Sequence, residues 1–308
     1  MAIKIIKNGI ADTIQDIGRY GYQHLGIQAN GYLDYQSASL ANTILGNPRS
    51  SPVFEIHFPA SSFSFTKSYT ICISGANFVP VLNEKSIALH TPIEVKQNDT
   101  LQFLKPIEGR ISYIAIQGKI NEEPWLSSHS FFANSIQKDA QFEWEASPPM
   151  NKKMVLGNEN SINPIINEIH SHVFSTSPLN FIPGPAWKDL TERSQKAFLS
   201  TGYHIGMQAN RMGYPLKGAV LQLSKPNQYL SAAVTRGTLQ LLPNGELMVL
   251  MADHQTIGGY ANLGQIILVD LPRLAQASHK TSFHFMETTI DTAHKLYQEI
   301  EKKFIHRS

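Results

Sequence analysis

A seven-residue string that occurs twice constrains the fold of this chain more than any other feature. The string His24-Leu25-Gly26-Ile27-Gln28-Ala29-Asn30 recurs as His204-Ile205-Gly206-Met207-Gln208-Ala209-Asn210, with five identities and two apolar exchanges. The offset of 180 residues is too long for a solenoid repeat. Two related domains, each carrying the string at an equivalent place, are the simplest interpretation. Chance similarity between two Gly/Asn turns is the alternative.

The length and composition of the chain indicate a globular protein with room for two domains. The chain has 308 residues, of which 42% are hydrophobic and 16% charged, a balance typical of folded rather than disordered proteins. The formal net charge is +2, and the Lys and Arg residues are scattered along the sequence. Because a nucleic-acid-binding face needs clustered basic residues, no nucleic-acid partner is expected.

Three features favour a cytoplasmic location. Cys72 is the single cysteine and lies in the apolar run Thr70–Ile73, so no disulfide framework is possible and a buried thiol is expected. The segment Met1–Lys7 is too short and too charged for a signal peptide. No stretch approaches 18 consecutive apolar residues, so no membrane-spanning segment is expected.

Many short apolar or alternating runs between turn residues predict a mainly β fold of barrel or sandwich type, with a few short helices. Helices are expected from the N-cap Asp34 through Leu45, over Ala186–Leu199, and at the C-terminus over Glu287–Phe304. The predicted organisation is a first β domain over residues 1–145, a linker over 146–180, a second β domain over 181–286 and a C-terminal helix over 287–308.

The Gly-rich segment Asp12–Arg19 holds the first of three polar groups that could form a site. It contains two acids, an amide and Arg19, whose guanidinium could clamp a carboxylate through two parallel hydrogen bonds. The alternative is that Asp16 and Arg19 pair with each other and only fix the loop.

The second polar group, Asn210, Arg211 and Gly213, overlaps the end of the second string. Arg211 aligns with Gly31 after the first string, so one copy carries a cation that the other lacks. We therefore interpret Arg211 as a ligand-binding residue, with an ordinary turn as the alternative. On this interpretation, Arg211→Ala should weaken the binding of an anion but lower the folding stability by less than about 1 kcal/mol.

The third polar group, Asp253–Tyr260, follows the apolar strand expected at Leu247–Met251. A strand that ends in polar side chains and glycines is a common way to present a site. We predict that this segment faces the same cleft as Arg211. His254 could titrate near neutral pH, although a structural hydrogen bond is the more common role for a lone histidine.

Several known site motifs are absent from the sequence. The histidines lack the close spacing to His, Cys or acidic residues that motifs such as His-Glu-x-x-His provide, so no metal is expected. There is no Gly-x-Ser-x-Gly nucleophile motif and no Walker-type phosphate loop. An ATP-dependent reaction would therefore need another chain to bind the nucleotide.

Motifs along nearly the whole chain resemble one known family. In the first half they are Thr13-Ile14-Gln15-Asp16, Gly18-Arg19, Gly21-Tyr22, Ala41-Asn42, Gly46-Asn47 and Phe54-Glu55. In the second half they are Pro183-Gly184-Pro185, Asn210-Arg211-Met212-Gly213-Tyr214, Gln255-Thr256, Gly258-Gly259-Tyr260 and Asp270-Leu271-Pro272. With these motifs the chain resembles the allophanate hydrolase subunit 2 family. That family is also described as KipA-like, as the biotin-dependent carboxyltransferase domain of urea amidolyase, or as the C subunit of 5-oxoprolinase.

The resemblance implies two cyclophilin-like β-barrel domains, which fits the internal repeat. It also implies partner subunits. In 5-oxoprolinase, three subunits of types A, B and C together cleave 5-oxoproline to glutamate with ATP, and in urea carboxylase the matching domain transfers a carboxyl group from carboxybiotin to urea. This chain has no Ala-Met-Lys-Met biotin site. The resemblance therefore implies that the chain itself binds no cofactor, that ATP is used by the complex, and that any carboxybiotin comes from a partner.

Some positions depart from the family pattern. Gln117-Gly118-Lys119-Ile120 stands where the family usually has Gly-Gly-Ile, and Leu126-Ser127-Ser128-His129-Ser130 replaces Gly-Ser-Arg-Ser-Thr. Phe131–Asp139 contains no glycine where the family has a Gly-rich loop, and His254 replaces an arginine. These departures imply altered specificity or reduced catalysis.

Two interpretations follow from the sequence. The first is a hydrolase subunit of the 5-oxoprolinase or carboxyltransferase type that acts with two partner chains, a KipI-like one of type B and another of type A. Its substrate-binding candidates are Arg19, Asn210, Arg211, Asp253, Gln255, Thr256 and Tyr260. The arginines would hold a carboxylate, while the amides and the hydroxyl would orient an amide or urea-like group. The alternative is a non-catalytic regulatory protein that binds a KipI-like partner.

Overall fold

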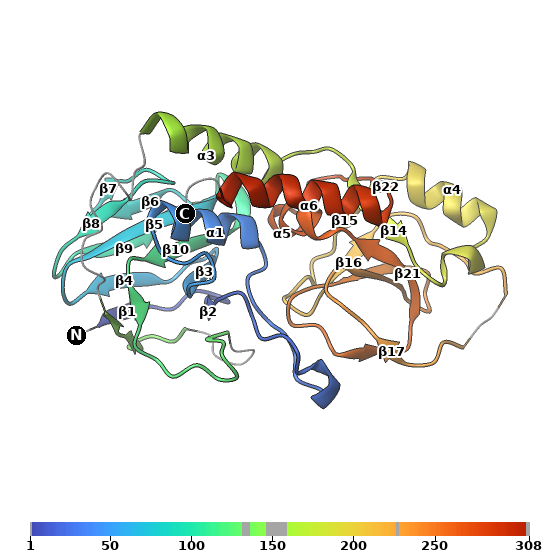
Figure 1. Ribbon diagram of the computed structural model, residues 1–308, viewed down its shortest axis with the longest axis horizontal. Coiled ribbons are helices and arrows are strands. Elements are labelled where there is room, and N and C mark those ends of the chain that lie inside the picture. The colour runs from blue at the N-terminus through green and yellow to red at the C-terminus, as the bar shows by residue number, and fades with distance from the viewer. Residues whose placement is uncertain (1, 131–135, 146–158, 226–227, 306–308) are drawn as a thin grey trace. The chain divides into compact units, whose positions relative to one another are not determined.

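The computed structural model describes residues 2–130, 136–145, 159–225 and 228–305 (Figure 1). They form two compact units, and the expected mainly β class is confirmed. The first unit contains the residues up to Arg19 and those from Asn30 to Phe174, and the second contains Tyr20–Ala29 and the residues from Ser175 onward. These bounds differ from the expected linker over 146–180, because helix α3 (Glu159–Val173) falls within that range and packs on helix α1 of the first unit. Residues 146–158 of the expected linker lie outside the described residues.

Two antiparallel sheets enclose the core of the first unit. The six-stranded sheet has the strand order β12 (Gln141–Phe142), β1 (Ile3–Lys7), β4 (Ser62–Phe65), β9 (Thr100–Phe103), β6 (Pro80–Leu82) and β7 (Lys85–Ser86). The five-stranded sheet has the order β2 (Thr13–Gln15), β3 (Val53–His57), β10 (Glu108–Ile116), β5 (Tyr69–Asn77) and β8 (Ile93–Val95). A smaller sheet pairs β11 (Lys119–Ile120) with β13 (Trp144–Glu145). Alternate apolar residues of both large sheets, such as Ile5 and Phe54, are fully buried in one cluster, as expected for facing sheets.

Helix α1 (Tyr35–Ile44) packs against β5 and β10 of the five-stranded sheet. The predicted N-cap is confirmed, because the Asp34 carboxylate accepts hydrogen bonds from the backbone N–H groups of Gln36 and Ser37 at 3.1 and 3.0 Å. The segment just before the helix is also hydrogen-bonded to the sheet, because the carboxylate of buried Glu55 of β3 accepts a hydrogen bond from the Leu33 N–H at 2.8 Å. A polar residue on a buried strand thus positions the helix that follows the first repeated string.

One curled seven-stranded sheet forms the second unit (Figure 1). Its strand order is β15 (His204–Ile205), β16 (Gly213–Lys217), β19 (Leu247–Leu250), β18 (Thr238–Leu241), β21 (Ala261–Ile266), β14 (Leu179–Pro183) and β22 (Phe285–Glu287). The β14–β22 pair is parallel and the other pairs are antiparallel. A separate two-stranded ladder joins β17 (Ala232–Ala233) to β20 (Ile257–Gly258).

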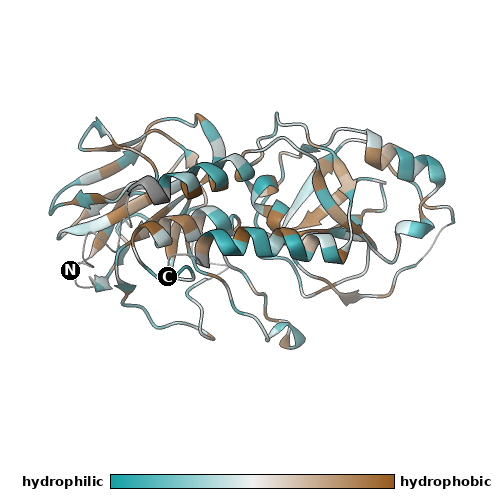
Figure 2. Cartoon of the chain, turned by 45° about the horizontal axis from the view of Figure 1, so that its top comes forward, coloured by the Kyte–Doolittle hydropathy of each residue, from teal (hydrophilic) through white to brown (hydrophobic). Residues whose placement is uncertain are grey.

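The helices of the second unit differ in part from those expected. They are η2 (Trp187–Asp189), α4 (Glu192–Ser200), η3 (Leu268–Asp270), α5 (Leu271–Gln276) and α6 (Ile290–Ile305), and a short η1 (Gln23–Leu25) lies in the 20–29 segment. The single helix expected over 186–199 is split, because Leu190 and Thr191 are extended with ψ of 149° and 150°. The C-terminal helix begins at Ile290 rather than Glu287, which belongs to β22. Figure 2 shows hydrophobic residues gathered on the strands inside each unit and mostly hydrophilic residues along α6.

Aromatic packing anchors α4 to the sheet of the second unit. Phe198 is fully buried and stacks on Phe285 of β22, with ring centroids 4.7 Å apart and an interplanar angle of 12°. Phe181 of β14 and Trp187 of η2 contact the same ring edge-on at 4.9 and 5.2 Å. These contacts fix the orientation of α4, whose first turn depends on a side-chain cap.

Thr191→Ala should lower the free energy of unfolding by about 1 kcal/mol. The Thr191 hydroxyl accepts a hydrogen bond from the Ser194 N–H at 3.1 Å, and alanine leaves that N–H without its cap. Thr191→Ser keeps the hydroxyl and should retain most of the stability. Urea denaturation of both variants tests the cap, and equal loss in both would contradict it.

The two copies of the repeated string differ in local structure. In the first copy His24 and Leu25 lie in the 3-10 turn η1, whereas His204 and Ile205 form strand β15. The first copy precedes helix α1 and the second follows helix α4. Asn30 adopts a left-handed φ of 56°, which Asn210 does not share. The two strings therefore differ in their local structure, and β15 pairs with β16 in the second copy.

Candidate functional site

A buried ion pair joins the second and third polar groups in the second unit. Arg211 Nε donates to Asp253 Oδ2 at 2.8 Å and Arg211 Nη2 donates to Asp253 Oδ1 at 2.9 Å. The side chains are 13% and 2% exposed. The backbone positions the pair, because Asp253 N–H donates to the Arg211 carbonyl at 2.8 Å, just beyond the β16–β19 pairing. The structure therefore brings together two of the residues chosen from the sequence.

This geometry corrects the expectation that Arg211→Ala would barely affect folding. That expectation required an Arg211 side chain outside any buried network. The carboxylate of Asp253 accepts two parallel hydrogen bonds from Arg211, the geometry in which such pairs are strongest. Removing the guanidinium would leave a nearly buried carboxylate without this partner, so Arg211 contributes to the stability of the unit.

Asn210 and Gln28 support the same loop. The Asn210 side-chain oxygen accepts a hydrogen bond from the Met212 N–H at 2.8 Å, and its amide nitrogen donates to the Gln208 carbonyl at 3.2 Å. These bonds make a local polar turn. Gln28 Nε2 donates to the backbone carbonyl of Asp253 at 2.8 Å, so the first string contacts the backbone of the loop that carries this ion pair.

The residues after Asp253 form a polar corner beside a buried amide. His254 is 5% exposed, its Nδ1 lies 2.5 Å from the Gln255 carbonyl, and burial lowers its pKa below the usual value. Gln240 of β18 is 1% exposed, and among the described residues its Nε2 has no hydrogen-bond partner. That Nε2 and Gln255 Nε2 lie 2.5 and 3.5 Å from the position that a Cβ on Gly258 would occupy. A side chain at position 258 would therefore displace the Gln240 amide, which lies against the backbone there.

The three other substrate-binding candidates are not part of the Arg211–Asp253 ion pair. They are Thr256, Tyr260 and Arg19. The Thr256 carbonyl accepts a hydrogen bond from the Val234 N–H at 3.1 Å. Tyr260 is 48% exposed and lines a pocket of about 710 Å³ together with Tyr229. Arg19 belongs to the first unit, where its Nη1 donates to Asn30 Oδ1 and its guanidinium carbon lies 4.7 Å from the centre of the Trp125 ring.

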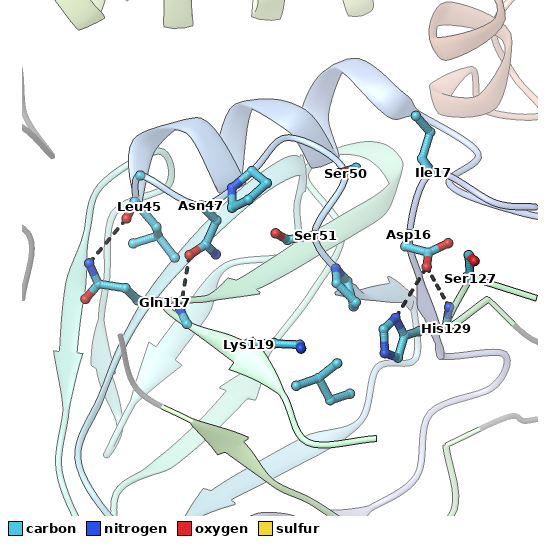
Figure 3. A pocket seen from close by; sticks show the side chains of 15 residues that line it. Asp16, Ile17, Leu45, Asn47, Ser50, Ser51, Gln117, Lys119, Ser127 and His129 are labelled. Carbon is cyan, nitrogen blue, oxygen red and sulfur yellow. Dashed lines mark hydrogen bonds and ion pairs between the residues drawn. The ribbon is translucent and has the colours of Figure 1, made fainter. Parts of the chain in front are cut away.

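A pocket of about 410 Å³ lies in the first unit, at the end of strand β2 (Figure 3). Its walls come from β2, the C-terminal end of α1, strand β11 and the 127–129 loop. The polar lining residues include Asp16, Asn47, Ser51, Lys119, Ser127 and His129. Asn47 fixes one wall, because its Oδ1 accepts a hydrogen bond from the Gly118 N–H at 3.1 Å beside Lys119.

Asp16 organises the opposite wall of this pocket. Its carboxylate accepts hydrogen bonds from the Gly18 N–H at 2.8 Å, the Ser128 and Ser130 hydroxyls at 2.7 and 2.8 Å, and the His129 N–H at 2.6 Å. Burial opposes ionisation of this carboxyl group, but hydrogen bonds from His129, Ser128 and the backbone lower its pKa to about 2. Asp16 is therefore charged at neutral pH and holds the 128–130 loop in place.

The imidazole of His129 is held between two acceptors. Nδ1 lies 3.5 Å from Asp16 Oδ2, and Nε2 lies 3.1 Å from the Glu122 carbonyl oxygen. The hydrogen bond with Asp16 raises the pKa of His129, against the effect of burial. Acceptors at both nitrogens favour the doubly protonated cation, so the pocket carries positive charge from His129 and from Lys119.

The sequence did not single out this pocket as a site. Asp16 was noted in the first polar group, and Lys119 and His129 only as departures from a family pattern. Asp16 and Ser130 are 114 positions apart, and no motif spacing relates them. Residues 131–135, part of the loop expected to replace a Gly-rich segment, lie outside the described residues.

The described part of the chain holds no group of three His, Cys, Asp or Glu residues arranged to bind a metal ion. Among the described helices, none has the length and apolar character needed to cross a membrane.

Comparison with known proteins gives matches over most of the chain. Residues 25–287 match the family model described as carboxyltransferase domain, subdomain A and B. The C subunit of 5-oxoprolinase from Escherichia coli is 27% identical over 310 residues, covering 98% of this chain and 96% of that protein. Urea amidolyase of Saccharomyces cerevisiae is 36% identical over 132 residues, which are 42% of this chain and 7% of that protein. The crystal structure of K. lactis urea amidolyase matches the fold with a TM-score of 0.88 and 22% identity, over 100% of this chain and 20% of that one.

Proposed function

Because the chain belongs to the family of carboxyltransferase domains with subdomains A and B, we propose that it is a component of an ATP-dependent 5-oxoprolinase, equivalent to the C subunit. One observation carries the proposal: the E. coli C subunit matches along 96% of its length and 98% of this chain. Urea amidolyase contains the matching region as only 7% of its length. A match over nearly the whole C subunit supports an equivalent role for this chain.

In this proposal the chemistry is divided between chains of a cytoplasmic complex. Two partner chains act with this one, a KipI-like chain of type B and a chain of type A, and ATP is bound by a partner, because this sequence has no Walker-type loop. Any carboxybiotin would also come from a partner. The contribution of this chain is to bind and orient the cyclic amide whose C–N bond is opened by water to give glutamate.

We assign the orientation of the amide to the polar corner of the second unit. Gln255 and Thr256 supply amide and hydroxyl groups, and Gln240 Nε2, which has no partner among the described residues, is a buried donor beside them. The Arg211–Asp253 pair holds the loop that carries them, together with the turn at Asn210. Tyr260, which is 48% exposed, stays a proposed substrate contact of the second unit, and Arg19 stays a separate proposed contact of the first unit.

Reconstitution tests the proposed function. The chain is purified together with the A- and B-type subunits of its source organism, and glutamate and ADP are measured with 5-oxoproline and ATP. We expect both products in the complete mixture and no 5-oxoproline-dependent ATP hydrolysis by the chain alone. Gln255→Ala should lower the rate by roughly 100-fold if the amide is an orienting donor in the transition state.

Two results would contradict the proposal. One is glutamate formation at the same rate by the two partner chains when this chain is omitted. The other is urea-dependent ATP hydrolysis by the complete mixture without any response to 5-oxoproline. If the chain only inhibited a KipI-like partner, the regulatory interpretation would replace the enzymatic one.

A further inference from the structure

The pocket of the first unit has a cation without a protein partner. Lys119 extends its ammonium group into the cavity (Figure 3). Among the described residues, Lys119 Nζ has no hydrogen-bond or ion-pair partner, in contrast to Lys4, which pairs with Asp139 at 3.1 Å. Glu145 is its cross-strand neighbour in the β11–β13 ladder, yet no ion pair joins them. An ammonium group that points into a concave space is available to an anionic ligand.

The second cation of the pocket is fixed in position. His129 is held by the Asp16 carboxylate and the Glu122 carbonyl, and its side chain is 16% exposed. Asp16, the carboxylate that lines the pocket, already accepts four hydrogen bonds from Gly18 and residues 128–130. Its charge is therefore largely compensated within the wall, which includes His129, and the cavity presents the Lys119 ammonium group to a ligand.

The remaining lining is apolar or neutral. Ile17, Pro48 and Pro52 supply accessible hydrophobic surface, and the buried side chains of Leu45 and Ile120 lie behind it. A volume of about 410 Å³ is at the lower end of the range for small-molecule sites. A compact ring or short chain with one carboxylate matches this combination better than a phosphate, which would leave the apolar walls uncovered.

We propose that the first unit binds a small organic monocarboxylate in this pocket, with the carboxylate on Lys119 and the apolar body against Pro48 and Pro52. This site is separate from the polar corner of the second unit to which we assign the amide. The proposal rests on the proposed function only in the choice of 5-oxoproline as the first ligand to test.

Three ligands of similar size separate the contributions to binding. 5-Oxoproline carries the lactam and the carboxylate, 2-pyrrolidinone carries the lactam alone, and cyclopentanecarboxylate carries the carboxylate alone. We expect the isolated chain to bind both carboxylates in calorimetric titrations and to bind 2-pyrrolidinone at least tenfold more weakly. Equal binding of 2-pyrrolidinone would overturn the assignment of the carboxylate, and so would inorganic phosphate binding more tightly than cyclopentanecarboxylate.

Lys119→Gln is the decisive variant, because Lys119 is an exposed strand residue outside the core. We expect it to weaken cyclopentanecarboxylate binding by roughly tenfold or more, with Lys119→Arg recovering most of the affinity. Lys85→Gln is the matched control, since Lys85 is also exposed in a two-residue strand of the same unit but lies outside the pocket. Unchanged binding by Lys119→Gln, with an unchanged thermal melt, would refute the site.

The outcome is independent of reconstitution with partner chains. If the complete mixture makes no glutamate but the isolated chain binds monocarboxylates through Lys119, the proposed function fails and the site stands. If glutamate forms and Lys119→Gln leaves both binding and turnover unchanged, the proposed function stands and the site fails.

Discussion

Arg211→Ala should lower the free energy of unfolding by about 3 kcal/mol. The variant removes both hydrogen bonds to Asp253 and leaves a carboxylate that is 2% exposed without its cation. Because Arg211 itself is 13% exposed, water can partly replace it, which places the loss at the lower end for a buried pair. Urea denaturation followed by circular dichroism measures the loss.

A double-mutant cycle separates this pair from general effects of mutation. Asp253→Asn should also be destabilising, because it leaves the Arg211 guanidinium without its anion. The double variant should lose less than the sum of the two single losses, because it leaves no lone buried charge. Lys217→Ala is the matched control: its pair with Glu246 lies in the same sheet, but the side chains are 60% and 30% exposed. We expect a loss below about 1 kcal/mol there. Additive losses for Arg211 and Asp253 would contradict the coupling.

The case of Arg211 shows what a repeat can and cannot indicate. The comparison with Gly31 correctly marked Arg211 as special to one copy. It did not show that the partner would be Asp253, 42 residues away, because that contact depends on the pairing of β16 with β19. The charge present in only one copy was interpreted as a ligand-binding residue, whereas in the structure it forms an ion pair within the protein.

Local signals in the sequence predicted the local structure well. Asp34 followed by a helix is an N-cap in the structure, and the many short runs are strands of three sheets with a few small ladders. The exception at residues 186–199 has a tertiary cause, since Leu190 pairs with Leu223 as a β-bridge and interrupts the helical pattern. Helical periodicity alone cannot show such a tertiary contact.

The first-unit pocket could not be predicted from spacing. Its walls come from segments near residues 16, 47, 119 and 129, which only the sheet topology brings together. The position of the 128–130 loop depends on hydrogen bonds to Asp16 across more than 110 residues. The sequence did show that Lys119 and His129 depart from the family pattern. Their place in a common pocket became visible only in the structure.

Asp16→Asn should lower the free energy of unfolding by about 3 kcal/mol at pH 7. The variant removes the charge and turns one acceptor oxygen into an NH₂ group that faces the donors of Ser128, His129 and Gly18. Thermal melts and urea denaturation measure the loss, and Asp16→Ala should be at least as destabilising. A loss below about 1 kcal/mol would show that the loop is held by other contacts.

The pH dependence of stability distinguishes this role from simple packing. The folded-state pKa of Asp16 is about 2, below the usual 3.8, so the folded state binds fewer protons and the contribution of Asp16 is complete above pH 4. It should be lost as the pH falls from 4 to 2, by about 2 kcal/mol in the wild type, and this slope should be absent in Asp16→Asn.

Asp12 is the contrasting control, because burial raises its pKa to about 6, so its ionisation lowers stability as the pH rises from 4 to 6. Asp12→Asn should remove that second slope and leave the slope below pH 4 unchanged, whereas a wild-type profile that is flat between pH 2 and 4 would contradict the role of Asp16.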